Sequence, residues 1–317
     1  MTRAGGMAPR MGSIGGPRRA GPARRGSARE YLRPLRFDHW IKNLVVPIGS
    51  LLALAAQRSF GGWSDVGAIL LAFIVSGLVS SVNYAVNEVL DAPFDASHPT
   101  KRERPIPSGR VRVGPLLGLT AAVALVAFGL CWWLLPRPVL HRVSALFLAG
   151  LVYNLPPIRL KDRPYLDVVT EALTNPIRLA IGWHAVAAAS PPALLLLAVW
   201  TFGAFLMTGK RLAELRLLGD VAARYRPTFR AYSVPGLFLV QLAYAAAGLV
   251  ALTWLVLSMR PEVLPGLPLV AGLLIWAFRM TFEPDSPLID PERLYRRPVF
   301  LLVSVVVFAV LVTLAFG

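Results

Sequence analysis

The sequence is poor in cysteine, in acidic residues and in charge overall. Cys131 is the single cysteine among 317 residues, which excludes an intrachain disulfide and a cysteine-rich zinc or iron–sulfur site. Only 16% of the residues are charged, whereas 56% are hydrophobic. A soluble globule of this size needs more polar side chains to cover its surface. The composition and the mean hydropathy of +0.58 therefore predict a polytopic membrane protein.

Long apolar runs occur throughout the chain. A helix needs about 20 residues to cross a hydrocarbon core about 30 Å thick. We therefore expect an all-α protein with about nine transmembrane helices, near 43–57, 65–90, 114–135, 140–156, 166–189, 192–209, 234–258, 264–281 and 298–316. The fifth of these segments carries several ionisable side chains, among them Asp167, Glu171 and Arg178. Such groups are costly at membrane depth unless they face a cavity or a partner, so they point to a functional site.

Basic residues are distributed unevenly between the two sides of the predicted membrane. If the N-terminus is cytoplasmic, the opposite side holds only Arg58, Arg137, Arg142 and Arg260. This asymmetry is the positive-inside pattern, and it predicts a multi-pass protein of the inner (plasma) membrane with a cytoplasmic N-terminus. The formal net charge of +16 is then explained by topology and by attraction to anionic lipids, and not by nucleic-acid binding.

The first 30 residues are rich in Gly, Pro, Ala and Arg and have no apolar period. We expect residues 1–30 to be a disordered basic cytoplasmic arm and residues 31–317 to be a transmembrane domain. No apolar core follows the charges of the arm, which argues against a secretory signal peptide. An organelle transit peptide is the alternative for an arginine-rich start, although the Gly and Pro content disfavours an amphipathic helix.

The acidic residues lie on one side of the predicted membrane. Apart from Asp65 and Glu262, every Asp and Glu falls on the predicted cytoplasmic side or in the fifth span near it. Acidic residues contribute little to topology, so another cause must place them there. A functional site rich in carboxylates is therefore expected at the cytoplasmic face.

Three oxygen-bearing residues follow one another at helical spacing. Asn87, Asp91 and Asp95 are four residues apart, so on a helix their side chains form one stripe. Amide and carboxylate oxygens without His or Cys favour a hard cation, and this set suits Mg²⁺ shared with substrate phosphates. We expect the three residues to bind the metal, with Asp91 and Asp95 as catalytic residues.

Basic residues follow this stripe directly. Lys101, Arg102 and Arg104 occur in "HPTKRERP" and can neutralise phosphate oxygens that the metal does not reach. The combination predicts a site for a metal–diphosphate complex.

The pattern NxxxDxxxD, followed by "RPIPSG", resembles the first aspartate motif of the UbiA superfamily of intramembrane prenyltransferases. The similarity extends from "LRPLRFDHWIKN" to the last apolar segment. The resemblance implies an all-helical protein with about nine transmembrane helices around a central cavity that opens to the cytoplasmic side and to the bilayer. It also implies Mg²⁺ as cofactor and transfer of a prenyl group from a prenyl diphosphate.

A second cluster, "YNLPPIRLKDRPYLD", resembles the loop that follows the fourth helix in this superfamily. The resemblance implies that Tyr153, Arg159 and Lys161 lie near the diphosphate. Asp167 and Glu171 follow at helical spacing, and we include them among the candidate catalytic residues.

A third cluster departs from the superfamily pattern. Most members carry a second aspartate-rich motif for another Mg²⁺, whereas "GKRLAELRLLGD" has Glu214 and no paired acids. Lys210 and Arg211 stand where acids were expected, which suggests that cations do part of the phosphate binding. Asp167, Glu171 or Glu214 would then orient a second metal, a ribose hydroxyl or an acceptor proton.

Three sequence stretches are similar to the branch that contains decaprenyl-phosphate phosphoribosyltransferase: "HPTKRERPI", "GKRLAEL" and "WIKN". Lys42 belongs to "WIKN" and is a further candidate phosphate ligand. Both chemistries begin with Mg²⁺-assisted loss of pyrophosphate. The leaving-group motif is common to both and does not choose between them, and "YNLPPIRLKDRP" is more similar to ordinary prenyltransferases. The main hypothesis is transfer of a prenyl group to an aromatic or lipid acceptor. The alternative is transfer of phosphoribosyl from phosphoribosyl diphosphate to a polyprenyl phosphate.

Each hypothesis implies membrane lipid, an isoprenoid diphosphate or polyprenyl phosphate, and a small-molecule acceptor or donor as partners. Oligomeric state is left open. Two further alternatives are a transporter, whose acids would form an ion path, and a non-catalytic lipid-binding or assembly protein.

Overall fold

The computed structural model describes residues 26–58, 60–96, 101–289 and 297–316. All regular structure in these ranges is helical, as the composition predicts. Most of the predicted arm, residues 1–25, lies outside the described residues. Ala28–Leu32 forms a short helix, α1, so the described end of the arm is helical.

Each of the nine predicted apolar segments contains a helix. The helices are α2 (Val45–Gln57), α3 (Trp63–Asp95), α4 (Val113–Leu134), α5 (Arg137–Asn154), α6 (Leu166–Val186), α7 (Ala193–Leu218), α9 (Val234–Met259), α10 (Leu267–Met280) and α11 (Pro298–Phe316). Short helical turns occupy the connections: α8 (Ala222–Tyr225), η1 (Arg33–Leu35), η2 (Phe37–Leu44), η3 (Lys101–Glu103), η4 (Leu160–Asp162), η5 (Gly219–Val221), η6 (Pro227–Arg230), η7 (Pro261–Gly266) and η8 (Pro287–Ile289).

Six helical segments of the described chain are long and apolar enough to cross a membrane: Ala28–Gln57, Trp63–Asp95, Val113–Leu134, Ala193–Leu218, Val234–Met259 and Pro261–Met280. The protein is a multi-pass membrane protein. The crossing of the bilayer by nine helices stays a prediction. In lipid, helices are favoured because their backbone hydrogen bonds are satisfied within the segment. Helix α6 is less apolar than these six because it carries the ionisable side chains noted above.

Helices α2 and α6 approach each other closely at two glycines. A Cβ on Gly49 would lie 2.1 Å from the carbonyl oxygen of Leu179, and one on Gly182 would lie 1.8 Å from that of Val46. Any larger residue would therefore push the two backbones apart. The hydroxyl of Ser50 donates a 2.7 Å hydrogen bond to the carbonyl of Gly182 at this crossing.

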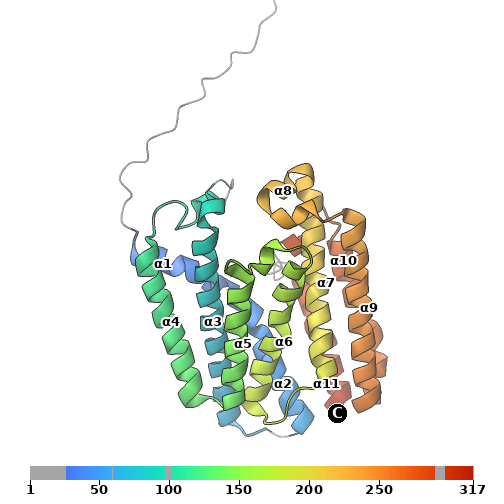
Figure 1. Ribbon diagram of the computed structural model, residues 1–317. Helices are drawn as coiled ribbons and strands as arrows, with labels where there is room; N and C mark the ends of the chain where they lie inside the picture. The colour runs from blue at the N-terminus through green and yellow to red at the C-terminus, as the bar shows by residue number, and fades with distance from the viewer. Residues whose placement is uncertain (1–25, 59, 97–100, 290–296, 317) are drawn as a thin grey trace, which may run out of the picture.

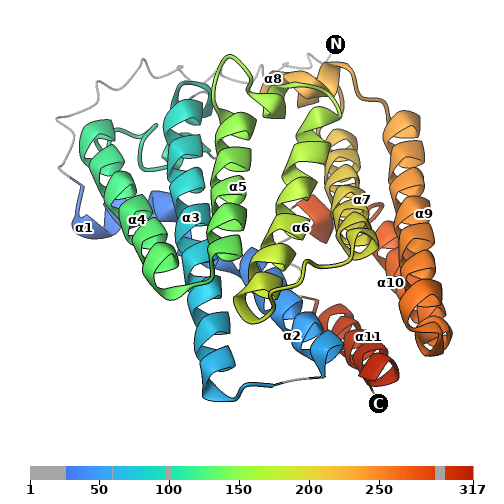
Figure 2. The same ribbon diagram turned by 60° about the horizontal axis from the view of Figure 1, so that its bottom comes forward.

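Neighbouring helices in the sequence are mostly neighbours in space, and α11 returns to contact both α10 and α2. Figure 2 shows α11 beside α2 near the C-terminus. An apolar core lies between α2, α3, α4, α5 and α6, where Val79, Leu146 and Ile181 are buried. These helices hold the polar groups at their ends in fixed positions.

The connections α3–α4, α5–α6 and α7–α9 lie at the same end of the helices, at the top of Figure 1. We call this end the site end, because α3 finishes there with Asp95 and α6 begins there with Leu166. The acids of the two helices therefore lie at one end of the bundle.

Candidate active site

The predicted oxygen stripe lies in the last turns of α3. The helix continues through Pro93 and ends at Asp95, so Asn87, Asp91 and Asp95 are all helical. The Oδ1 atoms of Asn87 and Asp91 both face the Nζ of Lys161, at 2.8 and 2.6 Å. Two of the three predicted ligands therefore meet at one point, as their spacing of four residues predicts.

Basic side chains from two loops contact this stripe. Lys161, on η4, also donates a 3.0 Å hydrogen bond to Oδ1 of Asn154. Arg159 lies 2.9 Å from Oδ1 of Asp91, and Arg104 lies 2.5 Å from Oδ2 of Asp95. The sequence predicted these bases as phosphate ligands, and the structure brings them to the carboxylates.

Burial affects the charge of Lys161. Its side chain is only 5% exposed, and burial lowers the pKa of the ammonium group because the charged form loses water. Asp91 acts in the opposite direction, through its charge and its hydrogen bond. The site thus pairs a partly desolvated cation with a carboxylate.

The donor set of the stripe fits a hard cation. The Asn87 and Asp91 oxygens already converge on one positive charge, and amide and carboxylate oxygens are ligands that Mg²⁺ prefers. No group of three or more His, Cys, Asp or Glu that could hold a metal ion occurs among the described residues. A metal ion here would therefore need substrate oxygens to complete its coordination.

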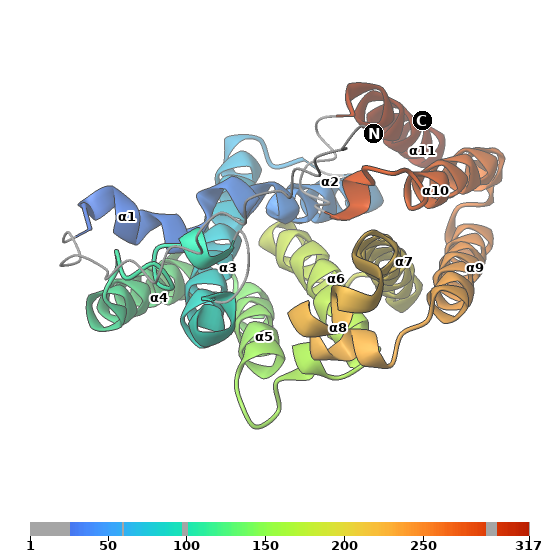
Figure 3. The ribbon, with the colours of Figure 1, turned by 90° about the horizontal axis from the view of Figure 1, so that it is seen from above.

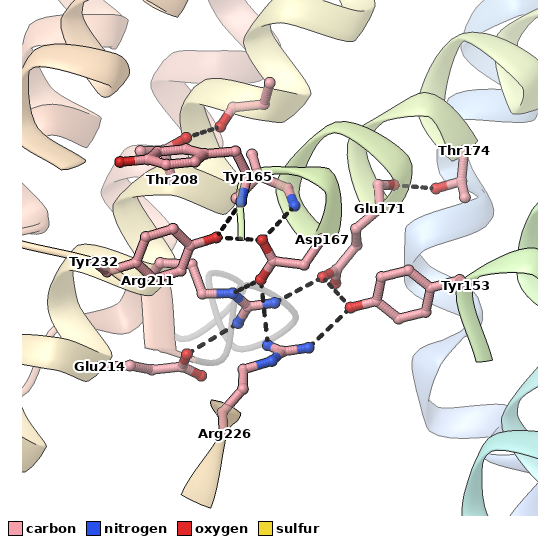
Figure 4. Close-up of polar contacts among 12 residues, drawn as sticks. Tyr153, Tyr165, Asp167, Glu171, Thr174, Thr208, Arg211, Glu214, Arg226 and Tyr232 are labelled. Atoms are coloured by element: carbon pink, nitrogen blue, oxygen red, sulfur yellow. Dashed lines mark hydrogen bonds and ion pairs between the residues drawn. The ribbon is translucent and has the colours of Figure 1, made fainter. Parts of the chain in front are cut away.

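A second acid cluster surrounds Arg211 of α7 (Figure 4). Its Nε lies 2.8 Å from Asp167, its Nη2 3.1 Å from Glu171 and its Nη1 2.9 Å from Glu214. Asp167 is 0% exposed and Arg211 is 1% exposed. Every nitrogen of the guanidinium therefore contacts a carboxylate in a buried network.

Two tyrosines and a second arginine extend this network. The hydroxyl of Tyr232 donates to Asp167 and accepts a 2.9 Å hydrogen bond from the backbone N–H of Tyr165. Burial raises the pKa of Tyr232, and the charge of Asp167 raises it further. Arg226 donates a 3.0 Å hydrogen bond to the hydroxyl of Tyr153 and lies 3.9 Å from Asp167.

Tyr153 completes the network on the α5 side. Its hydroxyl donates a 3.2 Å hydrogen bond to Glu171, and Figure 4 shows the ring pointing toward the acids from the neighbouring helix. The cluster therefore joins α5, α6 and α7 with the connection before α9.

The remaining predicted phosphate ligands lie on η2, η3 and α7. Lys101 and Arg102 form η3, where Lys101 is half-buried and Arg102 is exposed. Burial lowers the pKa of Lys101. Lys42 of η2 and Lys210 of α7 are both near enough to Glu171 to interact with its charge.

Arg178 of α6 was noted in the sequence as an ionisable residue of a predicted span but was given no role in the candidate site. The side chain is 6% exposed and donates to Oδ1 of Asn43 at 2.8 Å and to Oγ1 of Thr174 at 2.6 Å. Within the described part of the chain Arg178 forms no ion pair, and Nδ2 of buried Asn43 has no hydrogen-bond partner. An arginine well inside an apolar span was the available signal for this pair.

Asn154, Arg226 and Tyr232 were also absent from the predicted site. Their contacts depend on how loops fold back onto helices, which local spacing does not encode.

The sequence matches the model of the UbiA prenyltransferase family over residues 44–297. A decaprenyl-phosphate phosphoribosyltransferase from Mycolicibacterium smegmatis is 33% identical over 205 residues, or 64% of this chain and 62% of that protein. A 4-hydroxybenzoate octaprenyltransferase from Paraburkholderia phymatum is 34% identical over 128 residues, or 38% of this chain and 41% of that protein. The match thus spans less than two thirds of the length of either relative.

The fold is similar to that of a solved UbiA homolog from Archaeoglobus fulgidus, whose structure is bound to GPP and Mg²⁺. The TM-score is 0.69 and the sequences are 17% identical, over 90% of this chain and 99% of the homolog. At this identity the comparison establishes the fold alone.

Proposed function

Because this chain belongs to the UbiA prenyltransferase family, we propose that it is a membrane transferase that displaces pyrophosphate from a diphosphate donor. We infer that the donor is phosphoribosyl diphosphate and that the acceptor is a polyprenyl phosphate. The prenyl chain of the acceptor would lie between apolar helices and lipid, with its phosphate at the site end. The distribution of basic residues supports a cytoplasmic site end in a plasma membrane.

The observation that carries the choice of acceptor is the acid cluster around Arg211. Asp167, Glu171 and Glu214 all pair with this one guanidinium. A carboxylate whose oxygen is held in an ion pair is poorly placed to take a proton from an acceptor, because a general base must lie within hydrogen-bond reach of that proton. An aromatic or hydroxyl acceptor must lose a proton, whereas a phosphate monoester is already ionised at neutral pH. The paired acids therefore favour a phosphate acceptor, which needs no base.

The cations near the α3 stripe support a donor rich in phosphate. Lys161, Arg159 and Arg104 each contact an acid of the stripe and can exchange that carboxylate for a phosphate oxygen when the donor enters. Lys101, Arg102, Lys42 and Lys210 are further candidates at the same end. The relative named decaprenyl-phosphate phosphoribosyltransferase, which matches 64% of the chain, supports the same donor and acceptor.

The reaction that we propose breaks the bond between ribose C1 and the diphosphate oxygen, and both electrons leave with pyrophosphate. An oxygen of the lipid phosphate forms the new bond to C1, so no proton needs to be removed. Asn87, Asp91 and Asp95 would bind Mg²⁺, which neutralises charge on the departing pyrophosphate. Lys161 and Arg159 would bind the phosphate oxygens that the metal leaves exposed and thereby orient the donor.

In this account Arg211 is a positioning residue. Its guanidinium fixes Asp167 and Glu171 on α6 relative to Glu214 on α7, and it is too deeply buried to bind the donor directly. Lys210 and Arg211, which stand where most family members have acids, would then act mainly by removing the ligands of a second metal ion. Lys210, which is less buried, remains a candidate phosphate ligand.

Prenyl transfer from a prenyl diphosphate to an aromatic acceptor is the second candidate. The match to a 4-hydroxybenzoate octaprenyltransferase over 38% of the chain favours it. Transport is less well supported, because both acid clusters lie at one end of the helices and transporter sites lie near the midplane.

A label-transfer assay tests the proposal. Purified protein with Mg²⁺, ribose-labelled phosphoribosyl diphosphate and decaprenyl phosphate should produce a labelled lipid that partitions into organic solvent. If labelled prenyl diphosphate instead transfers its label to 4-hydroxybenzoate, and ribose label stays in water, the second candidate is correct.

A further inference from the structure

A cleft of about 750 Å³ lies between the N-terminal segment and the α3–α4 connection. We call it the arginine cleft, because five arginines line it: Arg29, Arg33, Arg36, Arg104 and Arg110. Three acidic residues also line it, namely Asp38, Glu88 and Glu103, so the lining is positively charged overall. No acid of the two clusters described above is among the residues that line this cleft.

The N-terminal segment carries three of these arginines. Arg29 of α1 and Arg33 of η1 are four residues apart, a spacing that brings side chains to one face of a helix, and Arg36 follows η1 in a left-handed backbone conformation. Pro34 and Leu35 are buried and fix the segment against the protein. The cleft is therefore built by the fold.

The arginines of the cleft are only partly neutralised. Arg110 lies 2.8 Å from Glu30, and Arg33 lies 3.8 Å from the same carboxylate. Among the described residues, the side chains of Arg29 and Arg36 have no hydrogen-bond or ion-pair partner. Arg36 is near enough to the cleft residue Glu88 to interact with its charge, and neither guanidinium is fixed by a hydrogen bond, so both can turn toward an anion.

One residue connects the cleft to the α3 stripe. Arg104 lines the cleft and also lies 2.5 Å from Oδ2 of Asp95. An anion in the cleft would therefore lie next to the proposed donor site. This is the position that an acceptor phosphate needs.

The rim of the cleft includes apolar side chains that are exposed. Leu32 and Phe37 line the cleft and are each 46% exposed. Figure 3 shows α1 at the outer edge of the molecule, beside α4. A chain of hydrocarbon attached to the anion could follow Leu32 and Phe37 into the surrounding lipid.

We propose that the arginine cleft binds the phosphate of a polyprenyl phosphate and that the prenyl chain leaves over Leu32 and Phe37. A phosphate monoester carries more charge than a phospholipid diester and offers three terminal oxygens to several guanidinium groups. Arginine is suited to this role because its planar fork matches phosphate oxygens. The assignment rests on the proposed function in one respect, that the acceptor is a lipid phosphate.

Binding of tritiated decaprenyl phosphate to the purified protein in detergent tests this proposal. The assay contains EDTA and no donor, so it reports on the cleft independently of transfer. Replacing both Arg33 and Arg36 by Gln should raise the Kd about tenfold or more, since charge-assisted hydrogen bonds are lost. Arg163→Gln is the matched control: Arg163 is exposed in the α5–α6 connection and does not line the cleft, so its Kd should change less than about twofold.

Two results would overturn the proposal. One is an unchanged Kd in the double variant. The other is displacement of decaprenyl phosphate by phosphatidylglycerol at equal concentration, which would make the cleft a general site for anionic lipids. If the double variant loses its thermal unfolding transition, Arg29→Gln replaces it, because Arg29 is exposed and unpaired. A wild type that binds the lipid but transfers no ribose would refute the proposed function and leave the cleft assignment standing.

Discussion

The ammonium nitrogen of Lys161 lies 2.6 Å from Oδ1 of Asp91, at the point where the amide oxygen of Asn87 also converges. The two charged residues are 70 positions apart in the sequence and come from a loop and a helix. Their pairing places a positive charge where the stripe would bind a metal ion. Donor binding must therefore rearrange Lys161, Arg159 or both.

The carboxylates of the stripe should be essential for turnover. Asp91→Asn and Asp95→Asn each keep the shape of the side chain but remove the charge that would bind Mg²⁺. We expect kcat to fall by at least about 100-fold in each variant, the scale seen when a group that stabilises transition-state charge is lost. Asp65→Asn, in the first turn of the same helix at the opposite end, is the control and should retain turnover. Retained turnover in both stripe variants would refute the metal site.

Lys161 should contribute to donor binding. Lys161→Met preserves much of the volume of the side chain and removes the ammonium group, so the KM for the diphosphate donor should rise about tenfold. Lys161→Arg should recover part of this loss because it restores the charge. Steady-state kinetics over a range of donor concentrations separates KM from kcat. Equal KM values in wild type and Lys161→Met would show that the residue only supports the fold.

Local spacing predicted the α3 stripe because helical geometry fixes which residues share a face. Asn87 and Asp91 face the same way whenever the chain between them is helical, and both lie in helix α3. Bases near these acids were predicted as well. Their pairing with individual carboxylates depends on loop conformation and could not be predicted.

Residue spacing alone cannot predict which cation of the third cluster faces the acids of α6. Lys210 and Arg211 are adjacent, and the sequence treats them as equivalent cations. Consecutive helical residues point about 100° apart, so only one of them can face α6. Arg211 reaches Asp167 across 44 positions, whereas Lys210 remains half-buried. The way in which α6 and α7 cross determines that Arg211, and not Lys210, contacts Asp167.

Arg211 should be required for stability. Arg211→Met leaves Asp167, Glu171 and Glu214 near one another without their central cation. Removing one partner of a buried ion network costs about 3–5 kcal/mol. The free energy of unfolding in detergent, followed by circular dichroism, should fall accordingly. Lys210→Met is the adjacent control and should unfold near the wild-type temperature; a donor-affinity defect without destabilisation in Arg211→Met would contradict the positioning role.

Tyr232 should stabilise the same network through its hydroxyl. Tyr232→Phe removes the hydrogen bond to buried Asp167 and leaves the backbone N–H of Tyr165 without its acceptor. We expect a loss of about 1–3 kcal/mol in unfolding free energy, the usual cost of unsatisfied buried groups. Thermal unfolding of the two proteins side by side measures it. Tyr244→Phe, in α9 and outside the network, is the control, and equal losses in both variants would argue against a specific role.

The choice between the two donors tests the account most directly. Phosphoribosyl diphosphate and a prenyl diphosphate, each with its own isotope, are supplied together at equal concentration with decaprenyl phosphate, 4-hydroxybenzoate and Mg²⁺. We predict that ribose label enters the lipid fraction, that EDTA stops the transfer and that prenyl label stays in its donor. Prenyl label in 4-hydroxybenzoate, with no ribose label in lipid, would contradict the proposed function.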